Sequence, residues 1–167
     1  NVVKQPVMTI LTPIDYDHME FLGTSLSAIA TEKAGILKPS VPCVVGAQSP
    51  EALTVIARAA YAKRAPLSVC GKSWNAAVTP TGIRVLMDTA TLELPLPKLL
   101  GAHQLHNAAV AAVAAKECFA LPVTDEQIAQ GIANAYWPGR LQQLKHGPLV
   151  EAWSIRGKVV IDGAHNP

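Results

Sequence analysis

The sequence is poor in cysteine and has almost no excess of charge of either sign. Its three cysteines, Cys43, Cys70 and Cys118, are odd in number and far apart. This pattern fits buried thiols in a reducing compartment better than a disulfide framework or a zinc site. The 14 basic and 12 acidic residues leave a net charge of +2. The charge balance therefore gives no reason to expect nucleic acid or an acidic membrane surface as the main partner.

Long apolar runs and an N-terminal leader are also missing. No run approaches the roughly 18 residues that span a bilayer, and no signal peptide opens the sequence. We therefore expect a cytoplasmic protein. We also expect a monomer, although these absences do not bear on that point. The first residue is not Met, and the sequence stops at "DGAHNP", directly after a strand-like run. Both ends are expected to be cut, so the chain is interpreted as a fragment.

The sequence does contain enough apolar residues for a core, since half of its 167 residues are hydrophobic. "VPCVVGA" and "PLSVC" are short apolar runs that predict buried strands. Between them lies "SPEALTVIARAAYAKRA", which predicts a helix that Ser49 caps and that has Pro50 in its first turn. The strand–helix–strand order predicts a parallel pair, as in three-layer α/β domains.

A different pattern follows from "WNAAVTPTGIRVLMDTATLELPL". Its turn signals at Pro80–Gly82 and Asp88–Ala90 predict a small antiparallel meander. Two helices are expected next, the second with Thr124 and Gln127 spaced as a capping box.

The last segment, "LVEAWSIRGKVVIDGAHNP", predicts a hairpin that ends in a buried strand, Val159–Ile161. The break in the helical pattern near Pro138–Gly139 predicts a domain boundary. We accordingly divide the chain into residues 1–139 and 140–167.

Two polar clusters follow predicted strands, where α/β domains form their ligand crevice. "DYDHMEFLG" contains His18, which could bind a metal through a neutral ring nitrogen. The alternative is a polar loop with a capping Asp and a packing His. "VVIDGAHNP" delivers Asp162 and His165 into a loop. The alternative there is a plain turn built from Asp, Gly, Asn and Pro.

Three further motifs could carry chemistry. "LLGAHQLHNAAVAA" places His103, Gln104 and Asn107 at the expected start of a helix, where free N–H groups attract phosphate; a plain capped start is the alternative. Arg140 in "PGRLQ" could bind phosphate or form a domain-linking salt bridge. Lys33 in "TEKAGILKP", taken alone, is an exposed helix lysine.

Together and in this order, five motifs resemble those of the folylpolyglutamate synthase/dihydrofolate synthase family of the Mur ligase superfamily. They are "DYDHMEFLG", "EKAGILKP", "LLGAHQLHNAAVAA", "WPGRLQ" and "DGAHNP", and they cover nearly the whole chain. The "EKAGI" block indicates the folate branch of the superfamily. The resemblance implies an α/β fold. Residues 1–139 would be part of the central ATP-binding domain, with a parallel sheet, helices and a small antiparallel sheet. Residues 140–167 would be the first strands of a Rossmann-like glutamate-ligase domain.

The resemblance implies an ATP-dependent amide ligase that adds L-glutamate to a folate or dihydropteroate carboxylate. ATP phosphorylates the carboxylate to an acyl phosphate, the glutamate amine attacks it, and the tetrahedral intermediate collapses to amide and phosphate. Because charge gathers on the phosphoryl oxygens, Mg²⁺ and fixed cationic or N–H groups carry much of this catalysis.

The resemblance also gives roles to individual residues. His18 matches a Mg²⁺ ligand, and Lys33 matches a catalytic lysine that becomes carbamylated. CO₂ would turn its cation into an anionic oxygen donor for the metal-bound water shell. Lys33 is therefore expected to point towards His18 and not into solvent. Asn107 matches a nucleotide-binding asparagine, with His103 and Gln104 beside it.

The C-terminal motifs match further parts of the family's site. Arg140 and Asp162 match residues that hold ATP phosphate and ribose, and His165 matches a catalytic position near the incoming glutamate or the γ-phosphate.

One element of the family is missing, because the sequence contains no G-x-x-G-K-[ST] segment. We therefore expect ligase activity from the full-length parent and not from these residues alone. Two other interpretations stay open. One is a cell-wall Mur ligase acting on a UDP-muramoyl peptide, and the other is a non-catalytic nucleotide-binding module.

Overall fold

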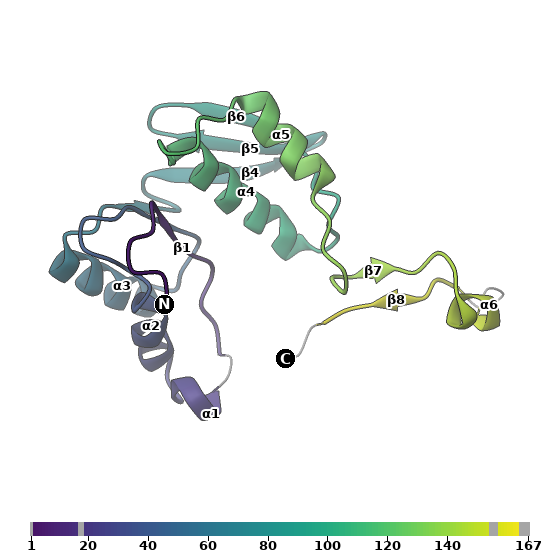
Figure 1. Cartoon of the computed structure of the whole chain (residues 1–167), viewed down its shortest axis with the longest axis horizontal. Coiled ribbons are helices and arrows are strands. Elements are labelled where there is room, and N and C mark those ends of the chain that lie inside the picture. Colours follow the sequence, from purple (N-terminus) through teal and green to yellow (C-terminus); the bar gives the residue numbers. More distant parts are fainter. Residues whose placement is uncertain (1, 17–18, 154–156, 164–167) are drawn as a thin grey trace.

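The computed structural model describes residues 2–16, 19–153 and 157–163. It contains both helices and strands, as the sequence predicts for an α/β fold (Figure 1). In chain order the elements are β1 (Thr9–Leu11), α1 (Met19–Leu22), α2 (Leu26–Ala34), β2 (Cys43–Val45), α3 (Pro50–Lys63), β3 (Leu67–Val69), β4 (Trp74–Thr79), β5 (Gly82–Met87), β6 (Thr91–Pro95), α4 (Ala102–Glu117), α5 (Asp125–Asn134), β7 (Gln142–Gln143), α6 (Pro148–Trp153) and β8 (Val160–Ile161).

The first part of the fold is a three-stranded parallel sheet in the order β1-β2-β3, packed against α2 and α3. The crossover helix α3 begins as predicted. The Ser49 side chain accepts a hydrogen bond from the backbone N–H of Ala52 at 3.2 Å, and Pro50 occupies the first turn. The predicted parallel pair with a helical crossover is confirmed.

The second part is the predicted antiparallel meander, β4-β5-β6, with α4 and α5 against it. A tight approach between strands fixes one of its glycines. A Cβ on Gly82 would lie only 1.9 Å from the carbonyl oxygen of Leu94, so no other residue fits there without moving β6.

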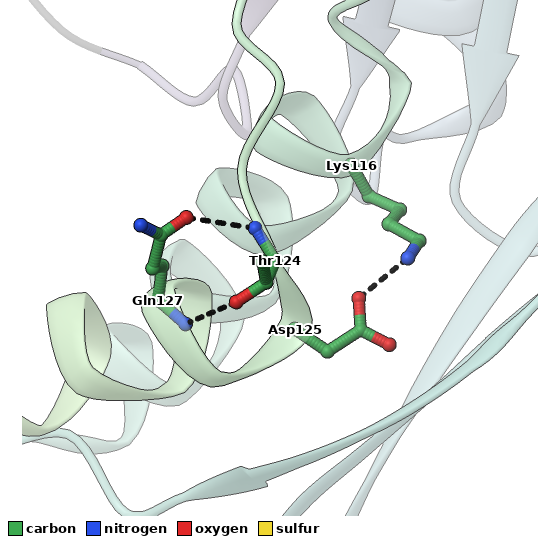
Figure 2. Close-up of polar contacts among 4 residues, drawn as sticks. All are labelled: Lys116, Thr124, Asp125 and Gln127. Carbon is green, nitrogen blue, oxygen red and sulfur yellow. Dashed lines mark hydrogen bonds and ion pairs between the residues drawn. The ribbon is translucent and has the colours of Figure 1, made fainter.

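Helix α5 carries the predicted capping box, which Figure 2 shows. The backbone N–H of Thr124 donates to Oε1 of Gln127 at 2.9 Å, and the backbone N–H of Gln127 donates to the Thr124 hydroxyl at 3.3 Å. Beside the box, Lys116 of α4 pairs with Asp125 of α5. Local side chains therefore fix both the start of α5 and its contact with α4.

Strand β2 contributes to both hydrophobic cores. Its side chains alternate in direction, as in any strand. Val44 is fully buried among residues of α4, α5 and the meander, whereas Cys43 and Val45 are buried with residues of α2, α3, β1 and β3. The central strand thus connects the two parts of the fold.

The C-terminal part differs from the sequence prediction. The segment expected to open a hairpin is helix α6, which Pro148 begins and whose first turn contains Glu151. The expected buried strand is wrong, since Val160 and Ile161 of β8 are 48% and 41% exposed. The reason is that β8 pairs with the two-residue strand β7, and this small sheet projects from the rest of the described chain (Figure 1).

Two expectations from composition can be compared with the structure. Cys43 and Cys118 are buried and Cys70 is partly buried, and all three are free thiols. Within the described ranges, no helix combines the length and apolarity that a membrane crossing requires.

Candidate functional site

The first turns of α4 bring three predicted site residues into one hydrogen-bonded group. The side-chain amide nitrogen of Gln104 lies 3.0 Å from Nε2 of His103. The amide nitrogen of Asn107 donates to Oε1 of Gln104 at 3.3 Å. Gln104 is buried, whereas His103 is exposed. The central amide therefore orients its two neighbours, and the group presents polar atoms at the start of the helix.

The start of α4 is also suited to an anion. The helix begins at Ala102, so His103, Gln104 and Asn107 lie in its first turns as expected. Its N-cap is Gly101, which makes no side-chain hydrogen bond to the helix. The free N–H groups of the first turn and the helix dipole both favour negative charge here.

Gly101 permits close packing at this point. Its φ is +109°, which residues with a side chain rarely adopt. A Cβ there would lie 2.7 Å from Cε1 of His103 and 3.1 Å from Cδ1 of Leu141. The absence of a side chain therefore lets His103 and the turn that contains Leu141 approach the first turn of α4.

That approach brings the Arg140 turn to the start of α4. Gly139 and Leu141 on either side of Arg140 both have left-handed backbone, with φ of +71° and +45°. The backbone N–H of Gly163 donates to the carbonyl oxygen of Gly139 at 2.6 Å. Since Asp162 directly precedes Gly163, the β7–β8 ladder brings Asp162 to the same turn. Arg140 and Asp162 are both exposed.

A cavity of about 490 Å³ lies beside this turn. Leu100, which precedes α4, and the aromatic residues Tyr136 and Trp137 line it together with the basic residues Arg140 and Lys145. Aromatic faces and cationic side chains in one cavity suit a ligand that is both planar and anionic.

The predicted metal region is described only in part. Lys33 lies in the last turn of α2 and its side chain is exposed, so the expectation that it avoids solvent is wrong. Lys33 lies one turn after the buried residues Ile29 and Ala30, in the last turn of α2, and its side chain is nevertheless open to solvent. His18 and His165 are outside the described residues. Among the residues that are described, no group of three or more His, Cys, Asp or Glu could hold a metal ion.

The structure adds two residues that the sequence did not indicate. Nε2 of His106 accepts a hydrogen bond from the backbone N–H of Ala47 at 3.0 Å. The side-chain amide of Gln48 donates to the carbonyl oxygen of Thr12 at 2.8 Å and accepts from the N–H of Ile14 at 3.1 Å. Both residues fix loops at the carboxyl ends of β1 and β2. The only available signal was their position, beside Asn107 and just after a predicted strand.

Comparison with known proteins identifies related enzymes. No family model matches the chain. The chain is 37% identical over 173 residues to the dihydrofolate synthase/folylpolyglutamate synthase of Bacillus subtilis, a match that covers 98% of this chain and 38% of the relative.

Solved structures give the same result for the fold. A complex of FPGS with AMPPCP and folate superposes with a TM-score of 0.82 at 31% identity. The match covers 100% of this chain and 40% of the solved chain. Escherichia coli FolC in complex with DHPP and ADP superposes with a TM-score of 0.76 at 37% identity. That match covers 95% of this chain and 35% of the FolC chain. The chain thus spans about two fifths of the length of the relatives that it matches.

Proposed function

We infer that this chain is part of an ATP-dependent ligase. The inference rests on its similarity, along almost its whole length, to folylpolyglutamate synthases and dihydrofolate synthases. The whole protein would join L-glutamate to a folate or dihydropteroate carboxylate. The observation that carries the proposal is the match over 98% of the chain, at 37% identity to a dihydrofolate synthase/folylpolyglutamate synthase. ATP, a folate or dihydropteroate, and glutamate would be its substrates.

The first turns of α4 would bind the nucleotide. The hydrogen-bonded group of His103, Gln104 and Asn107 supplies donors and acceptors in fixed positions. The N–H groups of the same turn supply positive potential without a competing cap. The related structures with AMPPCP or ADP support a nucleotide as the ligand.

The Arg140 turn would complete the nucleotide site. Its guanidinium can donate two parallel hydrogen bonds to phosphate oxygens, and the carboxylate of Asp162 can accept hydrogen bonds from ribose hydroxyls. Because the Gly163–Gly139 hydrogen bond holds the two segments together, both groups would move as one unit. His165 would act near the incoming glutamate or the γ-phosphate.

Residues 1–139 would then form part of the central domain and residues 140–167 the beginning of the glutamate-ligase domain. The left-handed backbone at Gly139 and Leu141, which turns the chain at this point, supports a connection between domains here.

The reaction needs an activated carboxylate, because a free carboxylate is a poor electrophile. A substrate carboxylate oxygen attacks the γ-phosphorus of ATP, and ADP leaves. The glutamate amine then attacks the acyl carbon and loses a proton, and inorganic phosphate departs. Fixed donors at the start of α4 and Arg140 would hold the phosphate charge that builds up.

A magnesium site is part of the proposal. His18 would be one ligand, and a carbamylated Lys33 would supply anionic oxygen to the surrounding water shell. The exposure of Lys33 fits this role in one respect, since the amine is accessible to dissolved CO₂. When bound, Mg²⁺ would neutralise charge on the phosphate oxygens.

The test is incorporation of labelled glutamate by the whole protein, with dihydropteroate or folate and, in parallel, a UDP-muramoyl peptide as acceptor. We expect incorporation only with the pterin acceptors, and loss of nucleotide binding in Asn107→Ala. Transfer only to the UDP-linked acceptor would establish the cell-wall activity instead. Intact nucleotide binding without any transfer would establish a binding module. Glutamate-dependent ATP turnover by the 167-residue chain alone would contradict its expected inactivity.

A further inference from the structure

His106, which has no role in the proposed chemistry, connects three parts of the fold. From α4 its Nε2 accepts the N–H of Ala47, which follows β2, at 3.0 Å. Its ring also stacks on Trp74 of β4, with ring centroids 6.0 Å apart and an interplanar angle of 26°. The same side chain therefore contacts the parallel sheet's loop and the antiparallel sheet.

The hydrogen bond from Ala47 defines the state of the ring. A nitrogen that accepts an N–H must carry no proton, so His106 is neutral, with its hydrogen on Nδ1. The approach is close, because a Cβ on Gly46 would lie 2.9 Å from Nε2. Protonation of Nε2 would place two hydrogens between the ring and Ala47 and break the contact.

The contact extends to the loop after β1. Gln48, the neighbour of Ala47, holds Thr12 and Ile14 through both ends of its side-chain amide. The segment after Ile14 contains the proposed metal ligand His18. A displacement of Ala47 away from α4 would therefore also displace the backbone that leads to the metal ligand.

We propose that His106 is a positioning residue, which sets the distance between the nucleotide-binding start of α4 and the loops after β1 and β2. Asn107 is the next residue on α4, so the two functions share one helical turn. The catalytic consequence rests on the proposed function, whereas the contact itself does not. A small misplacement of reacting groups lowers the rate more than it lowers substrate binding.

Burial lowers the pKa of His106, which keeps the ring neutral near pH 7. The neighbouring groups do little to oppose this. No titratable group is present in Trp74 of β4 or in the loop backbone at Gly46 and Ala47. On α4 itself, the titratable neighbour is His103, which lies about one turn earlier. The contact is therefore expected to respond to pH mainly through the ring of His106.

Two variants of the whole protein separate the parts of the contact. His106→Gln keeps an acceptor at the same reach as Nε2 and loses the stacked ring. His106→Phe keeps a ring against Trp74 and loses the acceptor. We expect kcat to fall about tenfold in His106→Phe, with the KM for ATP within about twofold. His106→Gln should recover most of kcat. We expect the rate of the native protein to fall as the ring becomes protonated, and His106→Gln should not show this fall.

Unchanged kcat in His106→Phe, or an equal loss in both variants, would overturn the proposal. The state of the ring is measured separately by nitrogen NMR of the same protein with ¹⁵N-labelled histidine. We expect the Nδ1–H form at neutral pH, and a shift of the Ala47 amide as the ring protonates. An Nε2–H ring would refute the contact whatever the activity. An Nδ1–H ring with the Ala47 shift, in a protein without ligase activity, would refute the proposed function and leave the contact established.

Discussion

Replacement of Gly101 by alanine should damage both the stability of the protein and its nucleotide site. The new methyl group would enter the space between the first turn of α4 and the ring of His103. It would lie 2.7 Å from Cε1 of that ring, well inside contact distance. The ring would have to turn, and its hydrogen bond to Gln104 would be lost.

The size of the effect follows from two contributions. Backbone at φ +109° and ψ 140°, which glycine adopts readily, costs a residue with a side chain about 1–3 kcal/mol. Loss of the hydrogen bond between His103 and Gln104 adds about 1 kcal/mol. The free energy of unfolding should therefore fall by about 2–4 kcal/mol in Gly101→Ala.

The chain offers two matched controls. Gly71 has φ +80°, and no atom lies within 4 Å of the place that an added methyl group would occupy, so Gly71→Ala has only the backbone contribution. Gly131 lies inside α5 with open space around it. Gly131→Ala should stabilise the protein by about 0.5–1 kcal/mol, because alanine is the better helix former.

Urea unfolding of the four proteins, followed by circular dichroism, measures these differences. ADP titration of the whole protein, with each variant, then measures the nucleotide site. Only Gly101→Ala should weaken ADP binding. If Gly101→Ala were no less stable than Gly71→Ala and bound ADP normally, the packing of His103 against the helix start would contribute nothing to stability or to nucleotide binding.

Three further predictions concern the cap, the buried histidine and the lysine. Thr124→Ala removes the acceptor of the capping box and should lower the free energy of unfolding by about 1 kcal/mol in urea; no change would show that the box is not needed. Burial lowers the pKa of His106, so the unfolded chain binds its proton more readily. The stability that the neutral ring provides is complete above its ordinary pKa of about 6.5 and is lost as the pH falls below it. Unfolding measured from about pH 7 to about pH 5 should show a steeper loss in the native protein than in His106→Gln, and equal slopes would contradict this. In the whole protein, Lys33→Arg should abolish glutamate transfer although it keeps the charge, since a guanidinium cannot form the carbamate. Bicarbonate or a short carboxylic acid should restore part of the activity of Lys33→Ala. A fully active Lys33→Arg would disprove the role.

The sequence was sufficient to predict the features that depend on residues close together in the chain. The cap at Ser49, the box at Thr124 and the turns of the meander each depend on a few consecutive positions, and all occur as predicted. The grouping of His103 and Asn107 was equally local, because both lie on one face of one helix turn. Patterns of this length are therefore sufficient for most elements of this fold.

The features that were predicted wrongly or were missed depend on distant parts of the chain. Val160 and Ile161 have the composition of a buried strand, but burial requires a second layer, and β7 alone does not provide one. The hydrogen bond between Ala47 and His106 joins residues 59 positions apart, and no local pattern indicates it. The roles of His18, Lys33 and His165 came from the family resemblance and stay predictions.

The alternation of side chains along β2 has a consequence for how the protein opens. Val44 belongs to one core and Val45 to the other, so neither core can separate without loosening the strand that the other one needs. The parallel sheet and the meander should then open together as one foldon, although they are different sheets. Amide hydrogens of Cys43–Val45 should be among the last to exchange with deuterium, at a rate set by global unfolding.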